Sequence, residues 1–99
     1  MKNISIEQLN KIVDNINLID IRDNYLYNID HIPNAINIPM NLLLMNPNNY
    51  LEKDKVYYIY CSYGISSKKA CKELLLKGFN VVNIDGGFNG YNLCKHIYK

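Results

Sequence analysis

The 99-residue sequence has no tryptophan, only three cysteines and three prolines, and a single arginine, Arg22. It lacks an apolar run long enough to cross a bilayer, and its first residues lack the apolar segment and cleavage site of a secretory signal. We therefore expect a cytoplasmic protein with no membrane partner. The formal net charge of +2 is too small to indicate binding to nucleic acid.

The three cysteines, Cys61, Cys71 and Cys94, form no Cys-x-x-Cys pair and no Cys/His cluster with zinc-ligand spacing. The two histidines, His31 and His96, lie far apart and have no carboxylate at a motif spacing. We expect no metal site and no cofactor. An odd number of cysteines in a reducing compartment also argues against structural disulfides.

Helical and β patterns alternate along the chain, which indicates an α/β fold with parallel strands in one domain, residues 1–99. Ser5 and Gln8 form a capping-box pattern, and Gly78 suits a left-handed helix end. The predicted helices or helical turns cover roughly residues 5–14, 23–29, 40–45, 67–77 and 88–98. The predicted strands cover residues 18–21, 35–38, 55–60 and 81–84.

A cysteine at the junction of a strand and a helix is the main chemical feature. The β-prone run Tyr57–Tyr60 ends at Cys61, a short loop with Gly64 follows, and a helix then begins. A thiol there faces the positive end of the helix dipole and free backbone amides, which favour the reactive thiolate. We expect Ser66 or Ser67 to cap this helix. The local pattern alone fits a reactive cysteine and a small buried residue equally well.

The other two cysteines lie in patterns typical of core residues rather than of reactive thiols. Cys71 belongs to the apolar stripe of the predicted helix, with Ala70, Leu74 and Leu75. Cys94 lies within the predicted terminal helix. We expect both to be core residues.

Several segments together resemble the single-domain rhodaneses and follow the order of that family's landmarks. They are Leu18-Ile19-Asp20-Ile21-Arg22, His31-Ile32-Pro33-Asn34-Ala35-Ile36-Asn37-Ile38-Pro39, Tyr60-Cys61-Ser62-Tyr63-Gly64-Ile65-Ser66-Ser67, Gly78-Phe79 and Asp85-Gly86-Gly87-Phe88. The resemblance covers nearly the whole chain. It implies a rhodanese-like α/β fold, with a parallel sheet of about five strands and helices on both faces.

The resemblance also implies sulfurtransferase chemistry at Cys61. The thiolate would take the outer sulfur of thiosulfate, a polysulfide or a persulfide, and pass it to cyanide or a thiol, either small or carried by a partner protein. Asp20 and Arg22 would lie beside the catalytic loop. The residues implied in substrate binding are Ser62, Tyr63, Gly64, Ile65, Ser66 and Ser67.

The chain departs from the family pattern at the end of its six-residue loop. Many active members have an arginine where this chain has Ser66, and serine cannot bind an oxyanion through a bidentate guanidinium. We therefore expect weak thiosulfate activity. Lys68 or Lys69 could restore part of the charge, or both could lie on a solvated helix face. His31 is expected to bond to backbone rather than act as a base.

The alternative functions differ in how they would use this loop. Phosphatases of the related fold need a loop longer by one residue and an arginine after the cysteine, and no arginine follows Cys61. An arsenate reductase would need the same arginine. The remaining alternative is a non-catalytic or weakly active rhodanese-like domain that relays sulfur, senses redox state or binds a partner.

Overall fold

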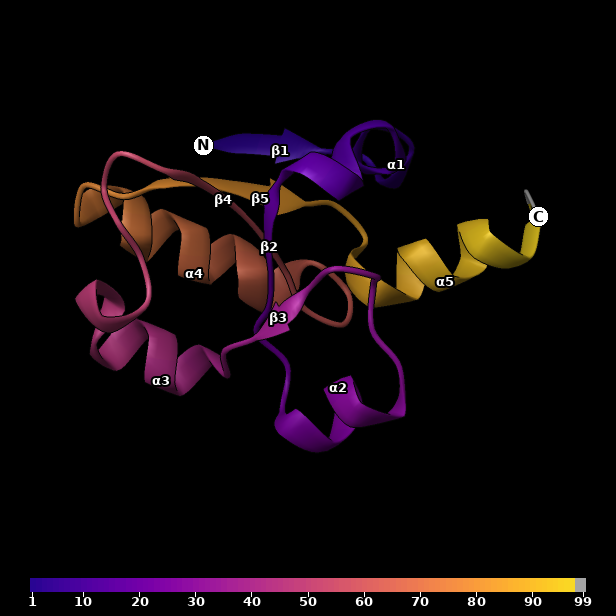
Figure 1. Ribbon diagram of the computed structural model, residues 1–99, viewed down its shortest axis with the longest axis horizontal. Helices are drawn as coiled ribbons and strands as arrows, with labels where there is room; N and C mark the ends of the chain where they lie inside the picture. The colour runs from indigo at the N-terminus through magenta and orange to yellow at the C-terminus, as the bar shows by residue number, and fades with distance from the viewer. Residues whose placement is uncertain (98–99) are drawn as a thin grey trace.

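Five parallel strands form one sheet in the order β1-β5-β4-β2-β3 in the computed structural model, which describes residues 1–97 (Figure 1). The strands are β1 (Lys2–Ile4), β2 (Asn17–Asp20), β3 (Ile36–Asn37), β4 (Val56–Tyr60) and β5 (Asn80–Ile84). Because all pairings are parallel, the carboxyl ends of the strands meet at one edge of the sheet.

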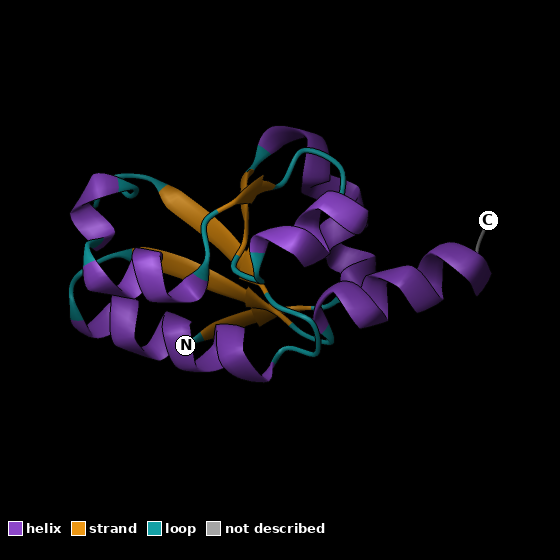
Figure 2. Ribbon diagram, turned by 90° about the horizontal axis from the view of Figure 1, so that it is seen from below, coloured by secondary structure: helices purple, strands orange, loops and turns teal. Residues whose placement is uncertain are grey.

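Helices cover both faces of the sheet (Figure 2). Helices α1 (Ile6–Ile12) and α5 (Gly87–Ile97) lie on one face, and α3 (Met40–Met45) and α4 (Ile65–Leu76) lie on the other. Helix α2 (Asn24–Ile29) connects β2 to β3. Two short 3₁₀ turns, Val13–Asn15 and Pro47–Asn49, follow α1 and α3. Within the described residues, no helix combines the length and apolar character needed to span a membrane.

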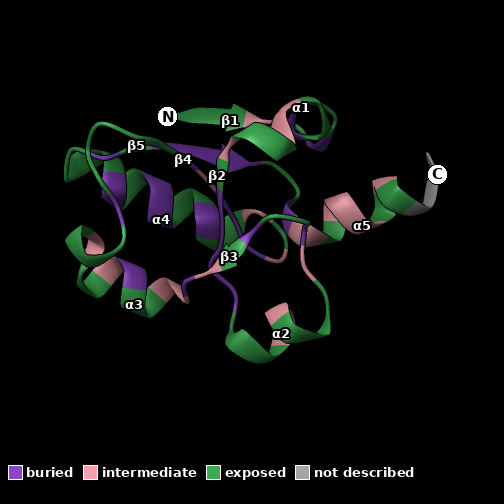
Figure 3. Cartoon of the chain, viewed as in Figure 1, coloured by how far each residue is buried: buried purple, intermediate pink, exposed green. Residues whose placement is uncertain are grey.

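The core has two halves because successive side chains of a strand point to opposite faces. In β4, Ile59 packs with Leu43 and Leu74 in the half under α3 and α4. Its neighbour Tyr60 packs with Leu9 in the half under α1 and α5. The buried residues in Figure 3 accordingly gather on the central strands and on the side of α4 that faces them.

The structure confirms the predicted fold class, and most predicted elements are present. Helix α1 begins with the predicted capping box: the Gln8 amide donates to Ser5 Oγ at 3.1 Å, and the Ser5 amide donates to Gln8 Oε1 at 2.9 Å. Gly78 has the expected left-handed conformation, with a φ of 93°. The predicted end of the last helix, Tyr98, lies outside the described residues.

Three details of the sequence-based assignment were wrong. Strand β1 was missed, because its three residues carry no alternating pattern and pair only with β5. Helix α4 begins at Ile65 rather than Ser67, and neither Ser66 nor Ser67 caps it, because Gly64 is the N-cap and the helix has no side-chain cap. Leu75 is 38% exposed and does not belong to the buried stripe of α4.

A buried ion pair lies at the carboxyl end of β2, on the face under α1 and α5. Arg22 Nη2 lies 2.8 Å from Asp20 Oδ2, and Tyr60 donates its hydroxyl proton to the same oxygen at 2.7 Å. Although burial opposes its charged form, the bonds to Asp20 raise the pKa of Arg22. Burial, together with the bond to Asp20, raises the pKa of Tyr60 well above its usual range. The Ile32 amide donates to the Tyr60 hydroxyl at 3.1 Å, so the group also anchors the segment before β3.

The first turn of α5 holds the segment that follows β4. The amides of Phe88 and Asn89 donate to the carbonyls of Cys61 and Ser62, at 2.8 and 2.9 Å. This approach requires glycine at position 87, where φ is 57° and an added Cβ would overlap the Cys61 carbonyl oxygen.

Replacing Asp20 by asparagine should lower the free energy of unfolding by about 3 kcal/mol, because Arg22 is left as an unpaired buried charge. Urea denaturation monitored by circular dichroism measures this loss. The control Glu73→Gln breaks an exposed pair with Lys77 and should cost less than about 1 kcal/mol. Equal losses of unfolding free energy in the two variants would show that the buried pair stabilises the fold no more than the exposed pair does.

Replacing Gly87 by alanine should lower the free energy of unfolding by about 2 kcal/mol or more, since it combines left-handed strain with backbone overlap. The matched control is Gly90→Ala in the same helix, where a Cβ meets only ordinary contacts. That variant should gain up to about 1 kcal/mol from helix propensity. A Gly87→Ala variant as stable as the native chain in urea denaturation would contradict the close approach of α5 to the Cys61 carbonyl.

Candidate active site

The Cys61 side chain lies directly beyond the carboxyl end of β4 and accepts two backbone hydrogen bonds. The Gly64 amide lies 3.1 Å from Cys61 Sγ, and the Ser67 amide lies 3.2 Å from it. The chain reaches this arrangement because Gly64 takes a φ of 92° and turns the loop into α4 within three residues. The positive end of the helix therefore faces the sulfur, as the sequence pattern predicts.

Two further amides belong to the same turn. Ile65 and Ser66 are the first residues of α4, and N–H groups in a first turn have no acceptor within their own helix. They lie between Gly64 and Ser67, whose amides donate to the sulfur, and successive N–H groups in such a turn can form an anion-binding concavity. Such a concavity suits an anion on the sulfur, or a second sulfur attached to it.

The side chain of Ser67 has a different role from the predicted cap. Its hydroxyl donates to Asn83 Oδ1 at 2.6 Å, and its oxygen lies 3.2 Å from Cys61 Sγ. Asn83 was missed as a site residue by the sequence reasoning. The available signal was a polar side chain within the otherwise apolar run Val81-Val82-Asn83-Ile84.

A hollow of about 470 Å³ opens over Cys61, which is itself 7% exposed. Its wall combines apolar side chains, the charged residues Arg22 and Asp23, and the loop that begins at Cys61. The lining residues are Ile21, Arg22, Asp23, Leu26, Met40, Cys61, Ser62, Tyr63, Ile65 and Ser66. The structure thus brings Arg22 and most of the predicted loop residues to one opening. Gly64 and Ser67 do not line the hollow, but their amides donate to the sulfur.

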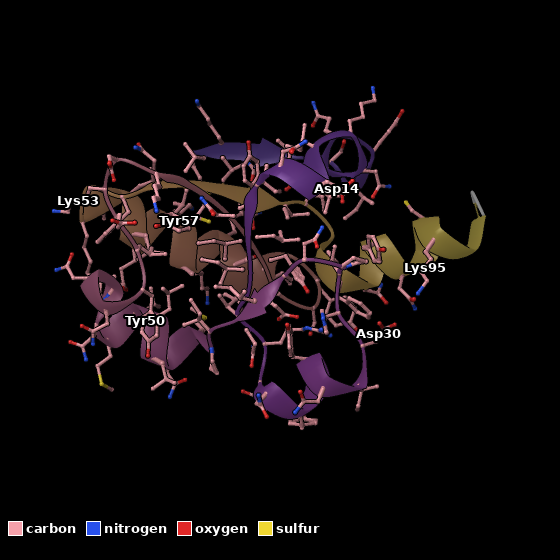
Figure 4. The ribbon with its side chains drawn as sticks, viewed as in Figure 1. Asp14, Asp30, Tyr50, Lys53, Tyr57 and Lys95 are labelled. Carbon is pink, nitrogen blue, oxygen red and sulfur yellow. The ribbon has the colours of Figure 1, made fainter. Side chains whose placement is uncertain are left out.

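Arg22 lines this hollow with a guanidinium that is already engaged. Besides its pair with Asp20, it donates from Nη2 to the Asp30 carbonyl at 2.6 Å and lies 4.3 Å from the centre of the Phe88 ring. Figure 4 shows Asp30, at the end of α2, facing Lys95 of α5, and their charged groups are 3.9 Å apart. Asp20 is bonded to Arg22 and Tyr60 and receives no bond from the loop at Cys61 within the described residues.

Lys68 and Lys69 do not line the hollow over Cys61. Both are exposed, and with Lys72 they border a separate hollow of about 410 Å³ on the other side of Tyr63 and Ile65. Their ammonium groups therefore do not occupy the place of a guanidinium in the loop.

The remaining candidate residues, Cys71, Cys94 and His31, contact the core or the backbone. Burial, with a contribution from nearby Cys61, raises the pKa of Cys71 to about 12, so this thiol stays protonated. Cys94 is half-buried against the core under α1 and α5. His31 Nδ1 lies 2.9 Å from the Tyr27 carbonyl oxygen, which confirms the predicted backbone contact. In the described part of the chain, no three His, Cys, Asp or Glu side chains are grouped to hold a metal ion.

Comparison with known proteins agrees with this geometry. Residues 5–94 match the rhodanese-like domain family. The chain is 32% identical to the thiosulfate sulfurtransferase GlpE of Shewanella oneidensis, over 92% of both chains. It is 36% identical to the adenylyltransferase and sulfurtransferase uba4 of Ogataea parapolymorpha, over 76% of this chain and 20% of that protein.

The solved structures support the same assignment. A rhodanese-like domain protein from Staphylococcus aureus superimposes with a TM-score of 0.84 and 30% identity, covering 92% of this chain and 91% of that one. Some curated relatives are much longer: the chain spans about a fifth to a quarter of uba4 and of the tRNA uridine(34) hydroxylase of Photorhabdus laumondii. The family match covers nearly all of this chain, and the chain belongs to the rhodanese-like domain family.

Proposed function

We propose that this chain is a sulfurtransferase that carries sulfur on Cys61 as a persulfide. The observation that carries the proposal is the pair of backbone amides, from Gly64 and Ser67, directed at Cys61 Sγ at 3.1 and 3.2 Å. Preorganised N–H donors stabilise negative charge on the sulfur without any rearrangement during the reaction. The relationship to the thiosulfate sulfurtransferase GlpE supports the same chemistry.

The reaction divides into two displacements at sulfur. The Cys61 thiolate attacks the outer sulfur of the donor, a new S–S bond forms, and the donor's own S–S bond breaks. Sulfite leaves with the electron pair when the donor is thiosulfate, and a thiolate leaves when it is a persulfide. An acceptor thiolate or cyanide then attacks the outer sulfur, and the Cys61 thiolate departs with the electron pair.

The charge of the site favours a persulfide or polysulfide over thiosulfate as the donor. Thiosulfate is a dianion, and the loop places Ser66 where a guanidinium would bind its oxygens. Arg22 is the one arginine of the chain, and Asp20 already neutralises it. The apolar wall formed by Ile21, Leu26 and Met40 suits the uncharged part of an organic persulfide.

Exposed apolar residues around the opening favour a sulfur relay between proteins. Tyr63 is 67% exposed and Ile65 is 69% exposed, and both line the hollow over Cys61. Large apolar side chains at the rim of a reactive group suit contact with a partner surface. In this role the chain receives sulfur from a persulfide on one protein and delivers it to a thiol on another.

Incubation with a sulfane-sulfur donor should add one sulfur atom to the native chain at Cys61. Intact-mass spectrometry, followed by peptide mapping, measures the addition with thiosulfate, inorganic polysulfide and glutathione persulfide in parallel. Cys61→Ser should gain no sulfur, whereas the control Cys94→Ser should gain it as the native chain does. Cys71 should stay unmodified, because it is fully buried and its pKa is raised to about 12.

The absence of added sulfur with all three donors would contradict the proposed activity. Addition that persists in Cys61→Ser would place the chemistry on another residue.

Ser66→Arg should raise kcat/KM for thiosulfate by about tenfold, mainly through a lower KM, because a bidentate guanidinium binds the donor's oxygens. Ser66 is exposed and lines the hollow, so the longer side chain has room. The matched control Ser66→Lys adds the same charge without the bidentate geometry of a guanidinium, so its kcat/KM should rise less. A steady-state assay with cyanide as acceptor measures both variants. An unchanged or lower kcat/KM in Ser66→Arg would show that the missing guanidinium does not limit turnover.

A further inference from the structure

A chain of buried polar side chains leads from the Cys61 sulfur into the sheet. Cys61 Sγ lies 3.2 Å from Ser67 Oγ, and Ser67 Oγ lies 2.6 Å from Asn83 Oδ1. Asn83 Nδ2 in turn lies 3.0 Å from Asn3 Oδ1 in β1 and 3.5 Å from the Asp85 carboxylate. Ser67 is 0% exposed and Asn83 is 1% exposed, so water does not compete for these groups.

The direction of each bond follows from the protons available. The NH₂ group of Asn83 donates to Asn3 Oδ1 at 3.0 Å and lies on the same side as the Asp85 carboxylate. The Asn83 oxygen then faces Ser67 and can only accept. Ser67 has one hydroxyl proton, and the short bond to Asn83 uses it. Toward Cys61, the Ser67 oxygen is therefore an acceptor.

An acceptor beside the sulfur suits a thiol and opposes a thiolate. For Ser67 to donate to a thiolate, its proton would have to leave Asn83, and the buried Asn83 oxygen would lose its donor. An unsatisfied buried acceptor carries a substantial free-energy cost. The two backbone amides stabilise the thiolate. The Ser67 hydroxyl is also close enough to donate to the sulfur, but its proton is held by Asn83.

We propose that Asn83 is a positioning residue that holds the Ser67 hydroxyl away from the sulfur and thereby restrains the reactivity of Cys61. The inference builds on the proposed function, in which Cys61 is the reactive group. In the persulfide form the inner sulfur is uncharged and needs no hydroxyl donor, so the network is satisfied when sulfur is loaded. The network disfavours the free Cys61 thiolate. This thiolate must form each time an acceptor takes the outer sulfur from Cys61. Asn83 therefore favours retention of bound sulfur over its release.

The test is a double-mutant cycle on the alkylation rate of Cys61 by iodoacetamide at about pH 6, where unperturbed thiols are mostly protonated. Asn83→Leu has nearly the same shape and lacks the acceptor, so it frees the Ser67 proton for the sulfur. Alkylation should be faster by about fivefold, since a donor to a charged acceptor outweighs the loss of thiolate nucleophilicity. The rate is followed by mass spectrometry of the peptide that contains Cys61.

The second arm of the cycle separates positioning from loosening of the fold. In a Ser67→Ala background there is no hydroxyl to release, so adding Asn83→Leu should leave the alkylation rate unchanged. The matched control is Asn80→Leu, at the exposed start of the same strand, which should leave the native rate unchanged. If Asn83→Leu does not fold, as judged by circular dichroism, Asn83→Ala takes its place in the same cycle.

Two results would overturn the proposal. One is a native or slower rate in the Asn83 variant, and the other is the same acceleration with and without the Ser67 hydroxyl. Alkylation needs no sulfur donor, so this result can be obtained whether or not Cys61 accepts sulfur. A chain that shows the coupling yet gains no sulfur would contradict the proposed transfer activity and leave the role of Asn83 standing.

Discussion

The short turn at residues 61–64, which joins β4 to α4, is the constraint that the rest of the site depends on. It brings the Gly64 and Ser67 amides to the sulfur, and it is tight enough that Gly64 needs a φ of 92°. A Cβ at Gly64 would lie 3.1 Å from the Gly86 amide nitrogen, so the lack of a side chain at Gly64 also lets the backbone of the loop after β5 approach closely. Gly87 then lets α5 approach the Cys61 carbonyl. Gly64 thus lets backbone amides reach the sulfur, and Gly87 lets α5 bind the carbonyls of the segment that carries it.

The side chains at the end of β4 point to opposite faces of the sheet and have different roles in the site. Tyr60 points toward α1 and α5, where it joins Asp20 and Arg22, and Cys61 points toward α4. The ion pair anchors the carboxyl end of β2 beside the end of β4, where the Ile21 amide donates to the Tyr60 carbonyl at 3.0 Å. The charged group therefore supports the strand that leads to the cysteine, while the sulfur itself accepts hydrogen bonds from two backbone amides.

Local sequence signals predicted the parts of this structure that depend on neighbouring residues. The capping box at Ser5 and the strand, cysteine and glycine at residues 56–64 follow from short-range pattern, and the structure contains both. The resemblance to rhodaneses added the number of strands. Strand β1 could not be predicted, because it is a strand only through its pairing with β5, 80 residues later. Asn83 was missed for the same reason, since its partners Ser67 and Asn3 come from distant segments.

The absence of a second arginine has a consequence for the kind of sulfur donor that the site suits. Backbone amides carry partial charges and reach only the atoms next to them, so they stabilise a sulfur anion well and a distant oxyanion poorly. A dianion that enters the hollow also loses hydration, and within the described residues the guanidinium beside it is already paired with Asp20. A persulfide brings less charge and places it at the sulfur that reacts, next to the Gly64 and Ser67 amides. In the reaction that we propose, the backbone amides at Cys61 therefore favour donors whose charge lies on sulfur.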